Sequence, residues 1–261
     1  MNDSNQLATL VNRSNYFVII CLQFAVLFSA NAAFAAEVKV GEFQAKATVV
    51  NIAGKEWAGK FENMIAPETE IEWDIIIPKN YKADTPPGVL VYISPGKSGQ
   101  IPRKWKLVLE EQNLIWIAAN RSGNRVDPRL RVAYAILGPV FLREKYQIDF
   151  ERVYVAGLSG GGRVASIVAP EYASLFKGAI YICGANLWEG KTPEKLEIAK
   201  SNRFVFLTGD QDFNRRDTKR VFNSYGNIGL ENALYLQIRG MGHENPDARG
   251  LAKAINYLDN D

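Results

Sequence analysis

The chain contains one histidine, His243, in the segment Gly-Met-Gly-His-Glu-Asn-Pro. Upstream, Ser159 stands in Gly-Leu-Ser-Gly-Gly, a pattern typical of a serine held on a tight turn between a strand and a helix. An imidazole can accept a proton from a serine hydroxyl near neutral pH and return it to a leaving group. The two residues therefore predict nucleophilic chemistry at Ser159, with His243 as the general base.

The residues around this serine predict the turn that such chemistry needs. Residues 152–156 are a β-branched run typical of a buried strand, and residues 163–169 favour a helix that ends before Pro170. The flanking glycines permit a cramped turn and place the Gly160 amide at a helix N-terminus. We therefore expect the Gly160 N–H to stabilise a developing oxyanion. The alternative is an ordinary serine in a glycine-rich turn.

An acid that orients the histidine is expected between the serine and the histidine, after a later strand. The apolar run 203–208 leads into Gly-Asp-Gln-Asp-Phe-Asn, which offers Asp210 and Asp212. Asp212 is preferred, because loops of this type usually present the acid three residues after the glycine that ends the strand. Asp210 could instead brace the turn. Asp212 or Asn214 could also cap the helix expected over 215–225.

The single histidine is expected in a loop that follows the last strand, over residues 233–238. Asn245 and Pro246 are the predicted N-cap and first residue of a terminal helix that reaches about Leu258. His243 then lies at the carboxyl edge of the sheet, where open α/β sheets place their sites. The alternative is a histidine in a surface loop that has no catalytic role.

With these residues in this order, the chain resembles the α/β-hydrolase superfamily. Within it, the chain is most similar to secreted esterases of the polyhydroxyalkanoate-depolymerase and feruloyl-esterase type, from about Glu72 to the C-terminus. The resemblance implies an α/β-hydrolase fold with a mostly parallel central sheet flanked by helices. It also implies Ser159 as nucleophile, Asp212 as orienting acid and His243 as base.

One segment departs from the pattern of those relatives. They commonly carry a His-Gly pair after an early strand, which supplies the second oxyanion-hole amide. Here the strand expected over 88–93 leads into Ser-Pro-Gly-Lys, and Pro95 has no N–H to donate. The second donor is expected to be the amide of Gly96 or of Lys97, and Gly96 is preferred. A flexible surface turn without this role is the alternative.

Three residues are candidates for substrate contacts. Asn120 and Arg121 follow a strand expected over 114–119 and offer amide and guanidinium donors. Trp188 lies in the segment 186–202, which is too short for a large cap domain. The segment therefore indicates an open cleft that accepts bulky or polymeric esters. Trp188 could equally be a packing residue.

Residues 38–73 show strand-like alternation and contain Trp57 and Trp73. They are expected to extend the sheet with antiparallel strands. Hydrophobic residues make up 47% of the chain, and no repeat or long linker interrupts it. Residues 36–261 are therefore interpreted as one α/β-hydrolase catalytic domain.

Residues 1–35 are interpreted as a cleavable signal peptide. They contain Arg13, an apolar block over 16–28, and the sequence Ala-Phe-Ala at 33–35, whose small first and third residues suit signal peptidase. The apolar block is too short to span a bilayer comfortably, so cleavage of residues 1–35 is favoured over their retention as a membrane anchor. A periplasmic or secreted protein without stable membrane insertion is expected.

Composition points to no further partner. The formal net charge of +3 does not indicate nucleic acid. The basic clusters at 121–131 and 215–220 are interpreted as solvated faces, with carboxylate recognition as the alternative. Cys21 leaves with the signal peptide, and Cys183 is interpreted as a core residue at a strand end. One histidine and one remaining cysteine argue against a zinc site, and no cofactor is required. The oligomeric state stays open.

The sequence thus predicts an exported serine carboxylesterase that works through an acyl-enzyme. A serine peptidase of the same fold is one alternative, because the same residues can cleave amides. A non-catalytic envelope protein that keeps the scaffold is the other.

Overall fold

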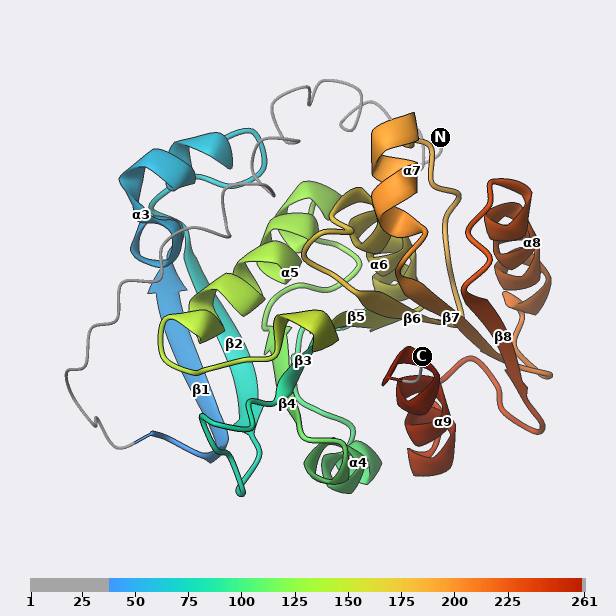
Figure 1. The fold of residues 1–261 in the computed structure, drawn as a ribbon, viewed down its shortest axis with the longest axis horizontal. Coiled ribbons are helices and arrows are strands. Elements are labelled where there is room, and N and C mark those ends of the chain that lie inside the picture. Colours follow the sequence, from blue (N-terminus) through green and yellow to red (C-terminus); the bar gives the residue numbers. More distant parts are fainter. Residues whose placement is uncertain (1–37, 260–261) are drawn as a thin grey trace.

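The structure is a computed structural model that describes residues 38–259. The predicted signal peptide over 1–35 and Cys21 lie outside the described residues. In this part of the chain, eight strands form one sheet in the order β1-β2-β4-β3-β5-β6-β7-β8 (Figure 1). The strands are β1 (Gly41–Thr48), β2 (Glu70–Ile77), β3 (Gly88–Ile93), β4 (Leu114–Ala119), β5 (Val153–Leu158), β6 (Gly178–Ile182), β7 (Arg203–Gly209) and β8 (Ala233–Ile238).

The sheet is parallel from β4 to β8 and antiparallel at its N-terminal end. Strand β2 pairs antiparallel with both β1 and β4, and every later pair is parallel. Strands β3, β4 and β6 are buried along their whole length, which explains their near-continuous apolar sequences. The predicted mostly parallel sheet with antiparallel N-terminal strands is confirmed.

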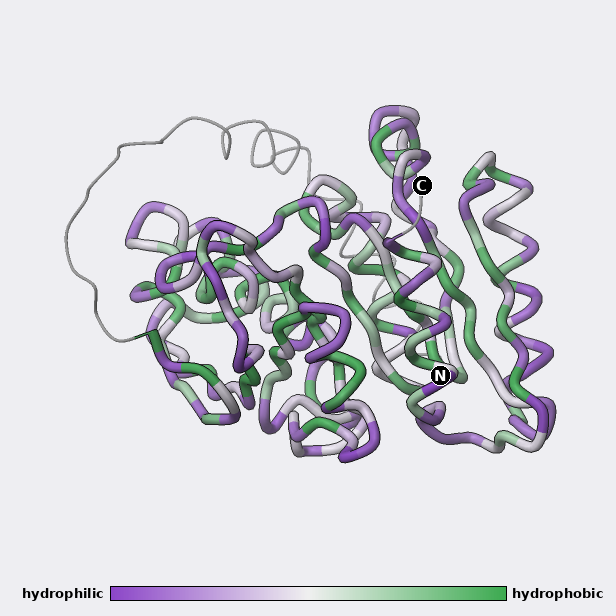
Figure 2. The backbone as a smooth tube through the Cα atoms, turned by 60° about the horizontal axis from the view of Figure 1, so that its bottom comes forward, coloured by the Kyte–Doolittle hydropathy of each residue, from purple (hydrophilic) through white to green (hydrophobic). Residues whose placement is uncertain are grey.

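Helices cover both faces of the sheet (Figure 1). One face carries α3 (Val49–Lys60), α5 (Pro128–Arg143), α6 (Gly160–Glu171), α7 (Pro193–Ala199) and α8 (Arg215–Asn227). The other carries α4 (Lys106–Glu111) and α9 (Ala248–Asp259) with the 3-10 turn η1 (Arg103–Trp105), and a second turn, η2 (Phe150–Arg152), precedes β5. Figure 2 shows hydrophobic colour along the central strands, with hydrophilic segments gathered in loops and on helices.

The strand order reverses where β3 lies between β4 and β5. The loop after β3 and the turn after β5 therefore leave the sheet side by side at its carboxyl edge. Ligand sites of open α/β sheets form at such a switch point. Ser159 directly follows β5, so the fold places it there.

The antiparallel expectation for residues 38–73 is right for β1 and β2 but wrong between them. Residues 49–60 form helix α3, which begins at Thr48, where the side chain accepts a hydrogen bond from the Asn51 amide. Gly54, at φ 75°, kinks the helix. A capping residue and buried side chains at Val49 and Ile52 outweigh the apparent alternation.

Two helix boundaries also differ from the predicted ones. Helix α6 continues past Pro170, because the Tyr172 amide still donates to the Val168 carbonyl. Helix α9 begins later than expected, because the side chain and carbonyl of Asp247 cap it. Asn245 is therefore not the N-cap, and its side chain instead accepts a hydrogen bond from the Tyr92 hydroxyl.

The segment between β6 and β7 holds only the short helix α7, so the described fold has no large cap domain. Within residues 38–259, no helix is both long and apolar enough to cross a membrane.

Candidate active site

Ser159, His243 and Asp212 form a chain of two hydrogen bonds at the carboxyl edge of the sheet. His243 Nε2 lies 2.8 Å from Ser159 Oγ, and His243 Nδ1 lies 2.7 Å from Asp212 Oδ1. The three residues follow β5, β8 and β7 respectively. The structure thus brings together the three residues that the sequence singled out.

Asp210, the competing acid, points elsewhere. Its Oδ1 accepts a hydrogen bond of 2.7 Å from the Gly240 amide, three residues before His243. The side chain therefore braces the loop that carries the histidine, the alternative role considered for it.

The turn that carries Ser159 holds its backbone in an uncommon conformation. Ser159 has φ 56° and ψ −117°, and it occupies the N-cap position of α6 without a side-chain capping bond. Its hydroxyl is consequently available to His243. A Cβ on Gly161 would lie 1.8 Å from the Ile93 carbonyl oxygen, so only glycine allows α6 to start this close to β3. Uncommon backbone conformations such as that of Ser159 occur preferentially at functional sites.

Asp212 is 5% exposed and accepts hydrogen bonds from several directions. Thr208 Oγ1 donates to its Oδ2 at 2.6 Å, and the Asn214 amide donates to its Oδ1 at 3.0 Å. Burial raises the pKa of Asp212, but the hydrogen bonds from Thr208, His243 and Asn214 outweigh it, so the pKa lies below the ordinary value. The carboxylate is therefore ionised where it faces the imidazole.

Asn214 stands at the N-cap of α8 but does not cap it with its side chain. Its Nδ2 donates instead to the Cys183 carbonyl at 2.9 Å. The side chain of Asn214 thus links the loop that carries Asp212 to the end of β6.

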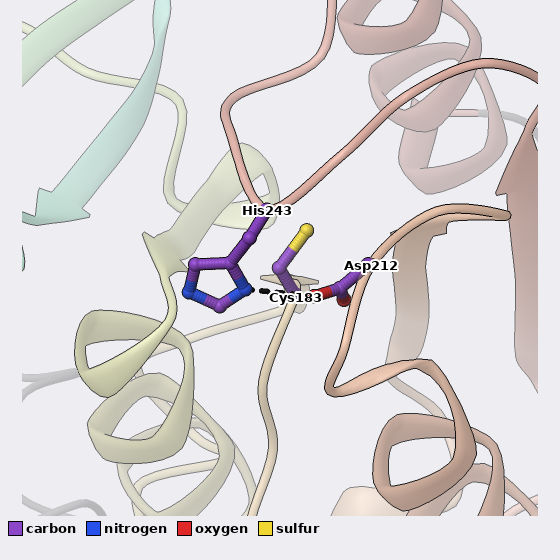
Figure 3. A group of neighbouring side chains, drawn as sticks. All are labelled: Cys183, Asp212 and His243. Atoms are coloured by element: carbon purple, nitrogen blue, oxygen red, sulfur yellow. Dashed lines mark hydrogen bonds and ion pairs between the residues drawn. The ribbon is translucent and has the colours of Figure 1, made fainter.

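Cys183 is a buried core residue, as expected, and it also lies beside Asp212 and His243 (Figure 3). Its Sγ lies 3.7 Å from the Gly242 carbonyl oxygen and 3.6 Å from that of Glu244, on either side of His243. Burial, with the nearby charge of Asp212, raises the pKa of the Cys183 thiol to about 12. The thiol is therefore protonated at neutral pH and is a poor nucleophile.

Among the described residues, Cys183, Asp212 and His243 form one group of metal-ligand type, with their ligand atoms within 4.8 Å of one another. A metal here has to displace the thiol proton and break the hydrogen bond between His243 and Asp212. This donor set suits a hydrogen-bonded acid and imidazole better than it suits zinc. The expectation of no zinc site stays a prediction.

The two expected oxyanion donors lie on segments that contact each other. Gly160 is the first residue of α6, so its amide is one of the helix's unpaired N-terminal donors. The Gly96 amide donates to Ser94 Oγ at 3.1 Å. Gly96 can therefore serve as a donor only when Ser94 releases it, which leaves Lys97 as a competing candidate.

Asn120 and Arg121 brace the loop after β3. Asn120 Oδ1 accepts from the Gly99 amide at 2.8 Å, and the Arg121 amide donates to the Lys97 carbonyl at 2.6 Å. The exposed Arg121 side chain lies 3.6 Å from Glu72. Their observed contacts support the loop that would hold the second oxyanion donor, and their substrate contacts stay a prediction.

Trp188 is 3% exposed and its Nε1 donates to Glu171 Oε2 at 3.2 Å. It packs in the core on the α6 face of the sheet. The structure therefore supports packing rather than substrate contact for this residue.

Phe213 was missed by the sequence analysis. It directly follows Asp212, its side chain is 77% exposed, and its ring stacks on the imidazole of His243 with centroids 4.0 Å apart. The signal that the sequence offered was an aromatic residue directly after the candidate acid Asp212.

A hollow of about 600 Å³ is lined by Leu187 and by residues of α8, and its lining does not include Ser159, Asp212 or His243. Its basic side chains are Arg216, Lys219 and Arg220. Binding of a carboxylate by the basic cluster 215–220 therefore stays an open alternative to a solvated face.

No family model matches the chain, and no curated protein matches it in sequence. Solved structures do match. An S-formylglutathione hydrolase from Staphylococcus aureus is 15% identical with a TM-score of 0.57, covering 85% of this chain and 99% of its own. A fluorophosphonate-binding serine hydrolase from the same organism is 13% identical with a TM-score of 0.60, covering 85% of this chain and 100% of its own.

A ferulic acid esterase is similar at 14% identity and a TM-score of 0.59, over 84% of this chain and 97% of its own. Together these likenesses show that the protein has the α/β-hydrolase fold, as its resemblance implied.

Proposed function

We propose that this protein is a serine hydrolase that cleaves carboxylic esters through an acyl-enzyme intermediate. The observation that carries the proposal is the hydrogen-bonded chain from Ser159 through His243 to Asp212. A serine on a strand-to-helix turn, an imidazole within 2.8 Å of its hydroxyl, and a buried acid behind the imidazole fit acyl transfer.

In the first half of the reaction, Ser159 Oγ attacks the ester carbonyl carbon while His243 Nε2 accepts the hydroxyl proton. Asp212 stabilises the imidazolium and holds Nδ1 as the protonated nitrogen. The carbonyl oxygen becomes an oxyanion, which the Gly160 amide and a second amide from Gly96 or Lys97 stabilise. Collapse of the intermediate expels the alcohol, which takes the proton from His243.

In the second half, water attacks the acyl group on Ser159 while His243 accepts a proton from the water. Collapse returns that proton to Ser159 Oγ and releases the carboxylic acid. His243 thus acts as base and acid in each half of the cycle.

The proposed activity is tested with p-nitrophenyl acetate and with a fluorophosphonate probe. The wild-type protein should hydrolyse the ester and take up the probe at Ser159. Folded Ser159→Ala should lose both, with turnover reduced by about a thousandfold or more. Near-wild-type turnover by this variant would remove the central claim. Ester and peptide substrates compared in one panel separate an esterase from a peptidase of this fold.

We also propose that the protein is exported and that residues 1–35 are removed. The supporting features are the short apolar block and the Ala-Phe-Ala sequence before Ala36. Expression of the full chain in a bacterial host, with N-terminal sequencing of the product outside the cytoplasm, should give a first residue of Ala36. An intact N-terminus on a cytoplasmic product would contradict the proposal.

A further inference from the structure

Arg131 is a buried cation that the reaction outlined above does not use. Arg131 is 4% exposed and lies in the first turn of α5. Across the described part of the chain, no carboxylate pairs with its guanidinium. From its sequence, Arg131 belongs to a basic cluster interpreted as a solvated face, and for this buried residue that interpretation is wrong.

This placement is costly for an arginine. Burial lowers the pKa of Arg131 to about 10, so the group is still charged at neutral pH but is destabilised by lost hydration. The N-terminal turn of a helix also disfavours positive charge. Its Nε is buried without a hydrogen-bond acceptor among the described residues. An apolar residue of similar length would avoid each of these costs.

The contacts of the Arg131 guanidinium indicate its role. Nη2 donates to the Ser94 carbonyl at 3.0 Å, and Nη1 donates to the Gly160 carbonyl at 3.3 Å. Ser94 begins the loop after β3, and Gly160 begins α6. One side chain therefore connects the two segments that carry the proposed oxyanion donors.

The relative position of these two segments matters for the proposed chemistry. An oxyanion hole works only when both amides point at the same developing charge, already fixed before the reaction. The segments are far apart in sequence and touch through backbone at Gly161, where a Cβ would lie 1.8 Å from the Ile93 carbonyl. Such a contact limits how close they come, and the fork of Arg131 limits how they rotate and separate.

We propose that Arg131 is a positioning residue that fixes the loop after β3 against the start of α6, so that their amides form one oxyanion hole. The proposal rests on the proposed esterase function. The fixed positive charge also favours negative charge nearby, because water does not screen it in this buried setting.

The test compares Arg131→Met, which removes charge and donors at similar length, with Arg131→Lys, which keeps the charge but not the fork. Arg129→Met is the matched control, because Arg129 lies in the same turn but is exposed and pairs with Asp127. For each protein, kcat and KM for p-nitrophenyl acetate are measured, together with the inhibition constant of a trifluoromethyl ketone. That inhibitor adds to Ser159 and places an oxyanion in the hole.

We expect Arg131→Met to lower kcat by about tenfold to a hundredfold, less than loss of a direct donor, with KM nearly unchanged. The inhibition constant should rise by a similar factor. Tm should stay the same or rise, because an unpaired buried cation has been removed. Arg131→Lys should fall between wild type and Arg131→Met, and Arg129→Met should match wild type.

Two results would overturn the proposal. One is a folded Arg131→Met with unchanged kcat and unchanged inhibition. The other is a loss of kcat in Arg131→Met and Arg131→Lys that follows a lower Tm while the inhibition constant of the trifluoromethyl ketone stays at the wild-type value, which indicates a purely structural role. Should Arg131→Met fail to fold, Arg131→Gln provides a neutral donor for the same comparison. Absence of ester hydrolysis and of labelling in the wild-type protein would instead refute the proposed function itself.

Discussion

The ring of Phe213 lies stacked on the imidazole of His243, with centroids 4.0 Å apart and planes inclined by 25°. One face of the imidazole is thereby shielded from water and its orientation is restrained. Because the phenylalanine side chain is otherwise exposed, its packing contributes little to the stability of the fold.

Phe213→Ala should therefore lower kcat/KM for esters by about threefold to thirtyfold through looser positioning of the base, without a change in Tm. Steady-state kinetics and thermal unfolding check this. Leu107→Ala is the control, since Leu107 is comparably exposed but lies in α4 on the opposite face of the sheet. Equal effects of the two substitutions would show that the stacked ring has no role in turnover.

The two aspartates of the β7 loop should respond differently to conversion to asparagine. Asp212→Asn removes the carboxylate that stabilises the imidazolium, so kcat should fall by about a thousandfold or more. Asp210→Asn keeps an oxygen that can accept from the Gly240 amide, so kcat should fall less than about fivefold. Parallel measurement of kcat for both variants decides, and a reversed ranking would assign the orienting role to Asp210.

The pH dependence of activity should report a single imidazole. Protonation of His243 occupies the lone pair that accepts the serine proton, so kcat/KM should fall when acid protonates the imidazole. The hydrogen bonds that Asp212 accepts hold its pKa below the ordinary carboxyl value, so this carboxylate stays ionised in weakly acidic solution.

An NMR titration of the imidazole should give the same midpoint as the acid limb of kcat/KM. The assignment is unambiguous, since the chain has one histidine. His243→Ala should lose both the limb and the activity. Ester hydrolysis by folded His243→Ala with an unaltered pH profile would point to another base.

Cys183 should resist alkylation in the folded protein. Its thiol is buried, and its pKa is raised to about 12, so iodoacetamide at pH 8 should label it only after unfolding. Mass spectrometry of native and denatured samples measures this. Folded Cys183→Ala should keep most of its turnover, because the thiol is not the nucleophile. Rapid native labelling together with loss of activity would reopen a role for the cysteine.

Ser94→Ala provides a test of the second oxyanion donor. The substitution removes the hydroxyl that accepts from the Gly96 amide and so frees that N–H. If Gly96 is the donor, kcat should rise by about twofold to fivefold, the gain expected when one weak competing hydrogen bond is lost. Unchanged kcat in a folded variant would favour the Lys97 amide.

Ser159, Asp212 and His243 could be placed from sequence because each stands in a local pattern of a strand followed by a turn. Strand ends in a parallel sheet meet at one edge, so three such patterns predict one site. Asp247 shows the limit of the same approach, because the choice of cap between neighbouring residues depends on contacts such as that of Asn245 with Tyr92.

The contacts of Arg131, Phe213 and Cys183 could not be predicted in this way, although the burial of Cys183 at a strand end was. The environment of each is made by segments far away in the chain: Arg131 contacts Ser94 and Gly160, and Cys183 contacts the loop around His243. A residue type alone does not indicate which segments will surround it. For Arg131 the local run of basic residues even favoured the opposite environment.

The loop that carries His243 is fastened on its downstream side by residues from the first half of the chain. The Tyr92 hydroxyl donates to Asn245, and Trp105 Nε1 donates to the Pro246 carbonyl at 2.9 Å. Because these contacts join segments distant in sequence, closing them costs chain entropy, and we expect them to form late in folding. During refolding, the serine turn can thus exist before the base reaches it. Recovery of the proposed activity would then report the docking of the C-terminal segment rather than formation of the central strands.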